Sequence, residues 1–199
     1  MSELKLFNKW KSNNIHIEDP GLQKYINLSD IIIPRTGGKY ATSRFGKSKY
    51  HIVERLINKL MNPGHKGKKH KLSSGHCTGK AINTYKIVQK CFEIIENETK
   101  TNPILVFAKA IENAAPREEI TSIEYGGARY PQAVEVAPQR RVDLVLKYMT
   151  QGAYAKSFGS KTSIERALAS EIIKAYKIDQ TSAAISKKLE TERQADSSR

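Results

Sequence analysis

Apolar positions recur with helical spacing in six stretches of the chain after residue 48. In each stretch they return every three or four residues, which is the period of one face of an α-helix. The third stretch contains the run ILVFAKAI, which is apolar nearly all round and is therefore expected at the centre of a bundle. The predicted helices span about residues 49–62, 79–99, 103–114, 139–155, 163–177 and 181–194.

Local signals set the ends of several predicted helices. Pro103 suits a first helical position, and Pro116 prevents the same helix from continuing. Asn62-Pro63-Gly64 ends the first helix. Thr162 and Glu165 have the spacing of a capping box at the start of the fifth. The last residues, ADSSR, are expected to fray.

Residues 117–137 change to a strand pattern, which predicts a β-hairpin between the third and fourth helices. Gly126-Gly127 lies between the two runs and marks the tip. Glu118, Glu124, Arg129 and Glu135 are scattered along it, so most of the hairpin is expected to be exposed. An isolated two-stranded hairpin is marginal in water, so this one is predicted to contact a partner.

Residues 1–48 show no regular spacing of apolar positions and are predicted to form an N-terminal arm that is extended and basic toward its end. Tyr40 and Phe45 lie in its Gly/Ser-rich basic part. They either stack on unpaired bases or anchor the loop to the protein core. The predicted fold is mainly α: a six-helix bundle over residues 49–199 with a protruding β-hairpin and this basic arm.

Charge is concentrated in one part of the chain. There are 34 Lys and Arg against 20 Asp and Glu, a net charge of +14. Residues 35–80 hold twelve basic residues and one acidic residue, Glu54. A solubilising face normally mixes both signs, so this ratio indicates a surface that contacts phosphates. The candidate RNA-binding residues here are Arg35, Lys39, Arg44, Lys47, Lys49, Lys66, Lys68, Lys69, Lys71 and Lys80.

Arg140 and Arg141 form a second basic concentration, in the first turn of the fourth predicted helix. Cations there oppose the helix dipole and cost a few tenths of a kcal/mol unless an anion meets them. We therefore predict that both bind RNA phosphates and do not stabilise the fold.

Metal and catalytic chemistry are not supported by the sequence. His65, His70, His76 and Cys77 invite a zinc interpretation, but His76 and Cys77 are adjacent, lysines surround them, and no Cys-x2-Cys pair exists. There is no phosphate-binding Walker loop and no Gly-x-Ser-x-Gly elbow. We predict no metal, no cofactor and no enzymatic activity.

Membrane and secreted classes are also disfavoured. The longest apolar runs are far shorter than the roughly 18–20 residues that cross a bilayer. The first residues do not form a secretory signal, and two cysteines, Cys77 and Cys91, are too few for a disulfide framework. The sequence predicts an intracellular protein without membrane contact.

DNA binding is the second hypothesis, as a free nucleic-acid-binding or chromatin-like protein. A helix-turn-helix needs two short helices joined by a tight turn, and the loop at 63–78 is too long for that. A long basic loop and a protruding hairpin fit folded RNA better.

Several separated motifs resemble one family in the right order. They are ATSRF at 41–45, IVERLIN at 52–58, NAAPRE at 113–118, GGARY at 126–130, QAVEVAPQRRV at 132–142 and AISKKLE at 184–190. Together they are similar to universal small-subunit ribosomal protein seven in its archaeal and eukaryotic form.

The resemblance implies a function for each part of the chain. Members of this family bind the 3′ major domain of small-subunit rRNA and nucleate assembly of the head. Their hairpin reaches the exit-tRNA site and the mRNA exit path, near small-subunit proteins nine and eleven. Here the hairpin tip is Tyr125, Gly126, Gly127, Arg129 and Tyr130. The resemblance implies a cytoplasmic protein of the small ribosomal subunit that does not form homo-oligomers.

Overall fold

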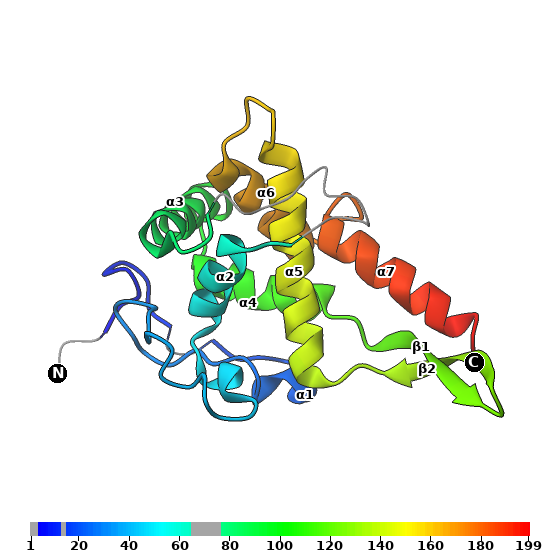
Figure 1. The fold of residues 1–199 in the computed structure, drawn as a ribbon. Helices are drawn as coiled ribbons and strands as arrows, with labels where there is room; N and C mark the ends of the chain where they lie inside the picture. The colour runs from blue at the N-terminus through cyan, green and yellow to red at the C-terminus, as the bar shows by residue number, and fades with distance from the viewer. Residues whose placement is uncertain (1–3, 13–14, 65–76) are drawn as a thin grey trace.

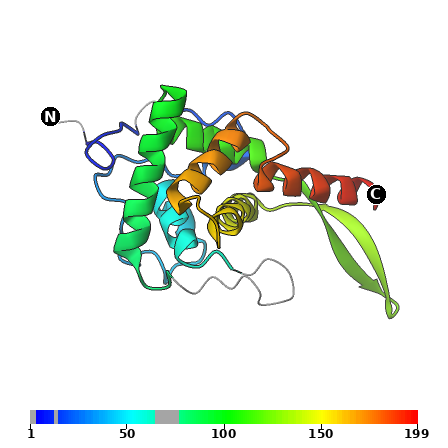
Figure 2. The same ribbon diagram turned by 90° about the horizontal axis from the view of Figure 1, so that it is seen from above.

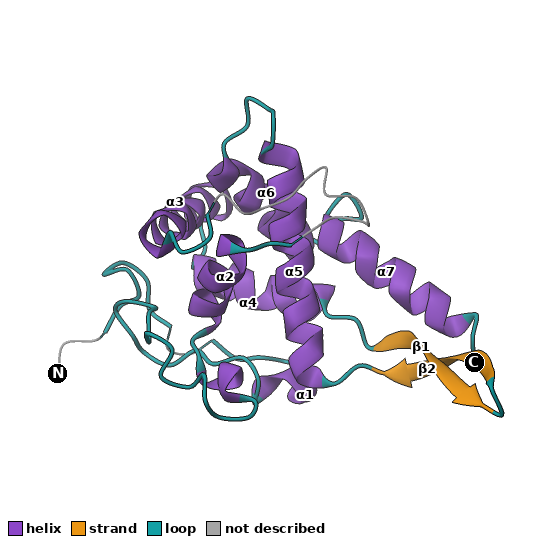
Figure 3. Cartoon of the chain, viewed as in Figure 1, coloured by secondary structure: helices purple, strands orange, loops and turns teal. Residues whose placement is uncertain are grey.

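The computed structural model describes residues 4–12, 15–64 and 77–199, and all six predicted helices form within them (Figure 1). The chain is mainly helical with one two-stranded antiparallel sheet, as the sequence predicts (Figure 3). The elements are α1 Pro20–Gln23, the 3-10 helix η1 Gly46–Lys49, α2 Ile52–Met61, α3 Ala81–Thr99, α4 Pro103–Ala114, β1 Glu118–Tyr125, β2 Ala128–Glu135, α5 Pro138–Ser157, α6 Ile164–Tyr176 and α7 Ala183–Asp196.

Helices α4 and α6 share the centre of the bundle. Helix α6 packs against α3, α4, α5 and α7, and α4 packs against α3, α5, α6 and α7. Ile104, Phe107 and Ile111 of α4 have no exposed surface, while Leu105 on its other side is 41% exposed. The prediction of a central third helix is therefore confirmed, and α6 joins it there.

The described part of residues 4–34, the first part of the predicted N-terminal arm, packs on the helical body. Leu6, Phe7 and Trp10 are buried. The Phe7 ring meets the ring of Tyr85 on α3 with centroids 4.8 Å apart, and the Trp10 ring lies 5.9 Å from that of Phe92. Aromatic side chains bury large apolar areas. Their burial fixes this segment on the helical body, although the segment contains only the short helix α1.

Capping residues explain where helices begin. Asn102 accepts a hydrogen bond from the backbone N–H of Ile104, and Pro103 occupies the first helical position, as predicted. The predicted cap at Thr162 is wrong, because the N-cap of α6 is Ser163, whose hydroxyl accepts from the backbone N–H of Arg166. The extended backbone of Ser163 allows its side chain to reach the first turn.

A buried carboxylate connects the three C-terminal helices. Glu171 of α6 has no exposed surface and pairs with Lys156 of α5. Its Oε2 accepts from the Ser182 hydroxyl at 3.2 Å and from the Ala183 backbone N–H at 3.0 Å, at the start of α7. The orientation of α7 is thus set by a fully satisfied polar group inside the bundle.

The hairpin extends away from the helices, and α7 runs beside its base (Figure 2). Glu118 pairs with Glu135 and Tyr125 with Ala128, which fixes the register. The last residues were expected to fray, but the structure places them against the hairpin. Ala133 N–H donates to the Ser198 carbonyl at 3.4 Å, and Arg199 pairs with Glu118 at 2.6 Å. These contacts tie the C-terminal end to the hairpin.

Candidate nucleic-acid interface

The basic segment, residues 35–49, is a series of tight turns followed by η1. Gly46 N–H donates to the Ser43 carbonyl at 2.9 Å, and Ser48 N–H donates to the Phe45 carbonyl at 3.1 Å. A Cβ on Gly46 would lie 2.0 Å from the Tyr40 carbonyl oxygen, so only glycine fits this turn. The backbone hydrogen bonds of the segment are largely internal, which leaves its side chains free to point outward.

Two contacts fasten the basic segment to the helical body. Glu54 of α2 is buried and accepts from both the N–H and the hydroxyl of Thr36, at 2.9 and 2.8 Å. The Asn27 side-chain amide donates to the Lys49 carbonyl at 2.6 Å. The one acidic residue of the 35–80 stretch therefore acts as an anchor and not as a counter-charge.

The cations of the basic segment are exposed, and three of them lie against aromatic rings. Lys39 and Lys49 each place Nζ 5.7 Å from the centre of the Tyr40 ring, and Arg44 lies 5.4 Å from that of Phe45. The Tyr40 ring packs on Tyr50 with centroids 5.6 Å apart. Tyr40 is thus an anchor within the loop, whereas Phe45 is 62% exposed.

A cleft of about 820 Å³, the α2–α5 cleft, lies beside this segment. Five cations face a single carboxylate, Asp143, along its wall. Asp143 is already engaged, because it pairs with Lys47 and accepts from Arg55 Nη2 at 2.9 Å. Burial lowers the pKa of Arg55, and Asp143 opposes that shift. The lining residues are Phe45, Lys47, Tyr50, Arg55, Asn58, Lys59, Asn62, Ala137, Gln139, Arg140, Asp143, Leu144, Leu146 and Lys147.

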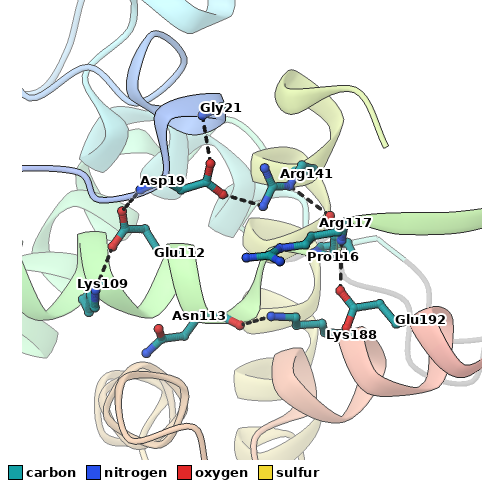
Figure 4. Close-up of polar contacts among 10 residues, drawn as sticks. All are labelled: Asp19, Gly21, Lys109, Glu112, Asn113, Pro116, Arg117, Arg141, Lys188 and Glu192. Carbon is teal, nitrogen blue, oxygen red and sulfur yellow. Dashed lines mark hydrogen bonds and ion pairs between the residues drawn. The ribbon is translucent and has the colours of Figure 1, made fainter. Parts of the chain in front are cut away.

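Arg141 behaves differently from the sequence prediction, because the fold supplies its anion. It is buried, and its Nη2 donates to Asp19 Oδ2 at 2.7 Å while its Nε donates to the Pro116 carbonyl at 3.0 Å (Figure 4). Burial raises the pKa of Asp19, but hydrogen bonds from Arg141 and Gly21 outweigh it and leave that pKa below its usual value. Arg141 therefore connects α5 to α1 and to the entrance of the hairpin.

The same cluster at the hairpin base contains further satisfied charges (Figure 4). Asp19 N–H donates to Glu112 at 3.0 Å, and Arg117 N–H donates to Glu192 of α7 at 3.0 Å. Lys188 donates to the Asn113 carbonyl at 2.8 Å, and burial lowers its pKa. We call this set the hairpin-base cluster; its residues are Asp19, Glu112, Asn113, Arg117, Arg141, Lys188 and Glu192.

Arg140 also has an internal anion, although it lies on the surface. Its Nε donates to Glu119 Oε1 at 2.7 Å and its Nη2 donates to Oε2 at 2.8 Å, a two-point contact with β1. Half of its side chain nevertheless remains exposed, and it also lines the α2–α5 cleft. The prediction assumed that Arg140 and Arg141 have no anionic partner within the chain, and this assumption is wrong for both.

The hairpin tip is a tight turn with an exposed aromatic face. Gly126 and Gly127 have φ of +57° and +81°, as a two-residue turn with successive positive φ requires. Ile123 pairs with Tyr130, two residues from the Tyr125–Ala128 pair, so these four side chains share one face. Tyr125 is 81% exposed. Arg129 pairs with Glu124 at 3.5 Å, so the tip presents little free charge.

Residues 22–199 match the family described as Ribosomal protein S7p/S5e. The chain belongs to this family. It is 56% identical over 197 residues to the small ribosomal subunit protein uS7 of Nanoarchaeum equitans, covering 99% of this chain and 100% of that protein. It is 48% identical over 188 residues to the uS7 of Methanothermobacter thermautotrophicus, covering 94% and 95%. The resemblance inferred from the sequence motifs is confirmed.

S7p/S5e is a family of ribosomal proteins and not of enzymes. Within the described ranges, no group of three or more His, Cys, Asp or Glu residues is placed to hold a metal ion. His65, His70 and His76 lie outside those ranges, as do the predicted RNA-binding residues Lys66, Lys68, Lys69 and Lys71. Among the helices that the structure describes, none is both long and apolar enough to cross a membrane.

Three cations that line the α2–α5 cleft of this S7p/S5e chain, Arg55, Lys59 and Lys147, were not among the predicted RNA-binding residues. Lys59 of α2 and Lys147 of α5 both line the α2–α5 cleft. Helical spacing gave a signal for Lys147, because it lies seven residues, or two turns, after Arg140. Helical spacing gave a signal for Lys59 as well, because it lies four residues after Arg55 of the same helix, which also lines the cleft.

Proposed function

We propose that this protein is a structural component of the small ribosomal subunit that binds rRNA of the 3′ major domain and nucleates assembly of the head. The observation that carries this proposal is the uneven pairing of charge. Arg35, Lys39, Arg44, Lys49 and Lys80 are exposed, and none has an ion pair among the described residues. Such cations gain most by neutralising phosphates.

The proposed interface consists of the basic segment, Lys80 and the α2–α5 cleft, with Arg140 at its edge. Phosphate contacts would hold the RNA in register on a rigid surface, while exposed Phe45 provides a stacking face. Arg141 is left out of this interface, because it is buried and its hydrogen bonds are made within the protein.

The hairpin has a separate role in this proposal. We place its tip, residues 125–130, near the exit-tRNA site and the mRNA exit path, with small-subunit proteins nine and eleven as neighbours. The side chains of Tyr125, Tyr130 and Ile123 are exposed at the tip, and α7 holds the base of the hairpin. A supported base and an uncovered tip favour contact with a partner.

The main test is binding of the purified protein to a 3′ major domain fragment of archaeal small-subunit rRNA, with duplex DNA of equal length as competitor. We expect the rRNA fragment to bind about a thousandfold more tightly, with both affinities falling steeply as salt rises. Equal affinity for the two would favour a general nucleic-acid-binding protein and reject the proposal.

The role of the hairpin is tested by shortening it without disturbing its base. Deletion of residues 122–125 and 128–131 joins Thr121 to Gly126 and Gly127 to Gln132, and Thr121 and Gln132 already pair in the sheet. We expect unchanged rRNA affinity and weakened exit-site tRNA binding in reconstituted subunits. Loss of rRNA binding would show that the division between helical body and hairpin is wrong.

A further inference from the structure

Gln139 has an amide that the fold leaves without hydrogen bonds. It lies in the first turn of α5, is 7% exposed, and lines the α2–α5 cleft. Neither its Oε1 nor its Nε2 has a partner, and both atoms are shielded from solvent.

An unsatisfied buried amide costs free energy in the folded protein, and an apolar side chain of similar size would avoid that cost. Gln139 also lies beside the backbone N–H groups at the start of α5. Ala137, the N-cap of α5, has no side chain that could accept from the first-turn N–H groups, so the positive end of this 20-residue helix stays uncapped by its N-cap residue. A ligand with a donor, an acceptor and a negative charge would match both features.

We propose that the α2–α5 cleft is a binding pocket for one unpaired adenine of rRNA, whose edge is recognised by Gln139. The amide oxygen would accept from the adenine N6 amine, while the amide nitrogen donates to an adjacent ring nitrogen, the two-point pairing typical of Gln with adenine. Exposed Phe45 provides a face for stacking. Lys47, Lys59 and Lys147 would hold the flanking phosphates, together with the α5 N-terminus.

Charge favours a nucleotide over a peptide in this pocket. The single carboxylate of the wall, Asp143, is already held by Arg55 and Lys47, so a basic peptide would find no free counter-charge there. An acidic peptide would satisfy the lysines but would offer Phe45 no flat ring system. Because both amide atoms are shielded in the free protein, the atoms that cover them must move aside as the base enters.

This inference rests on the proposed function and is tested with the same 3′ major domain fragment. The first measurement uses wild-type protein and pools of the fragment in which purine riboside, which lacks the N6 amine, replaces single adenosines. We expect the bound fraction to be depleted of the analogue at one unpaired adenosine. Absence of any such position would overturn the pocket while leaving rRNA binding intact.

The second measurement compares Gln139→Leu with wild type in affinity and in thermal unfolding. We expect the leucine variant to bind the fragment about tenfold to a hundredfold more weakly and to lose the depletion at that adenosine. Its unfolding temperature should be unchanged or higher, because an unsatisfied amide has been removed. Gln194→Leu, the same substitution at an exposed residue of α7, is the control and should change neither quantity.

The outcomes separate the two proposals. Equal affinity and equal analogue depletion for wild type and Gln139→Leu would reject the adenine pocket alone. A lower unfolding temperature with unchanged rRNA affinity would make Gln139 a purely structural residue and would also reject it. Failure of the wild-type protein to prefer the rRNA fragment over duplex DNA would reject the proposed function itself.

Discussion

The hairpin-base cluster and the α2–α5 cleft are both rich in Arg and Lys, but they differ in how those charges are satisfied. In the hairpin-base cluster, Arg141 meets Asp19 and a carbonyl, and Lys188 meets the carbonyl of Asn113. In the cleft, Lys47 and Arg55 pair with Asp143 and Arg140 pairs with Glu119 at its edge, while Lys59 and Lys147 have no ion pair among the described residues. The pairing of each charge therefore distinguishes those that maintain the fold from those available to a partner. The number of basic residues alone does not make this distinction.

The comparison has a direct physical consequence. Removing one member of a buried pair leaves the other charge without compensation, so the free energy of unfolding falls. Removing an exposed cation has little effect on folding, because solvent already stabilises that charge. Each region should thus respond to mutation in only one of two measurements, stability or RNA affinity.

The largest expected effect comes from charge reversal in the basic segment. Lys39→Glu, Arg44→Glu and Lys49→Glu together should weaken binding to the rRNA fragment roughly a thousandfold, because three phosphate contacts are replaced by repulsion. The slope of log affinity against log salt should fall in magnitude by about three. Filter binding across a salt series measures both quantities.

A matched control has the same change of net charge elsewhere. Lys90, Lys161 and Lys177 are exposed and lie outside the proposed interface, on α3, in the α5–α6 loop and after α6. Their reversal to glutamate should weaken binding far less. Equal losses for the two triple variants would mean that only total charge matters, and the comparison between regions would fail.

The next effect concerns stability. Arg141→Gln should lower the free energy of unfolding by about 2–4 kcal/mol, because it leaves Asp19 and the Pro116 carbonyl partly unpaired. Binding to the rRNA fragment should stay within a fewfold of wild type when measured on folded protein. Urea unfolding, with Asp19→Asn and the double variant to complete a cycle, checks this coupling. A stable Arg141→Gln protein with lost RNA affinity would reverse the assignment.

The contrast between Arg140 and Arg141 shows what the sequence can and cannot predict. Helix periods, Pro103 and Gly126-Gly127 are local signals, so the helices and the hairpin were found with nearly the right bounds. Asp19, the partner of Arg141, is 122 residues away in sequence, and no local pattern announces such a contact.

Non-local packing accounts for the other differences. Phe7 and Trp10 are buried because α3 brings Tyr85 and Phe92 to them, although their own segment shows no period. The basic stretch of residues 35–80, in contrast, could be located from composition alone, since 12 cations with one acid cannot be neutralised locally. The cleft required the structure, because Lys47, Lys59 and Lys147 meet only when α2 and α5 pack together.

A smaller effect lies at the N-terminus of α2. His51 caps α2, accepting from Val53 N–H at 3.2 Å, and burial lowers its pKa to about 4, with Asp30 opposing the shift. An unfolded chain protonates this histidine near pH 6.5, so its contribution is present above that pH and is lost as pH falls toward 4. The loss should reach about 2 kcal/mol at pH 5.

His51→Asn separates this contribution from other titrations. Asparagine is a good N-cap that does not titrate, so the variant should show a smaller drop in unfolding free energy between pH 7 and pH 5 than wild type. Urea titrations at the two pH values measure the difference. An identical drop in both proteins would show that His51 does not control the acid sensitivity of the protein.

The smallest expected effect is also the most direct test of the comparison, because it changes the neighbour of Arg141. The Arg140–Glu119 pair lies at the surface, with 56% of the Arg140 side chain exposed, and surface pairs contribute about 0.2–1 kcal/mol. Arg140→Gln should therefore lower the free energy of unfolding by less than about 1 kcal/mol and reduce the salt slope of rRNA binding by about one. Two adjacent arginines of equal charge would then differ in kind, one affecting mainly folding and the other mainly binding. If both variants instead lost stability to the same extent and kept full affinity, the N-terminus of α5 would belong entirely to the packed body, and the interface would end at the basic segment.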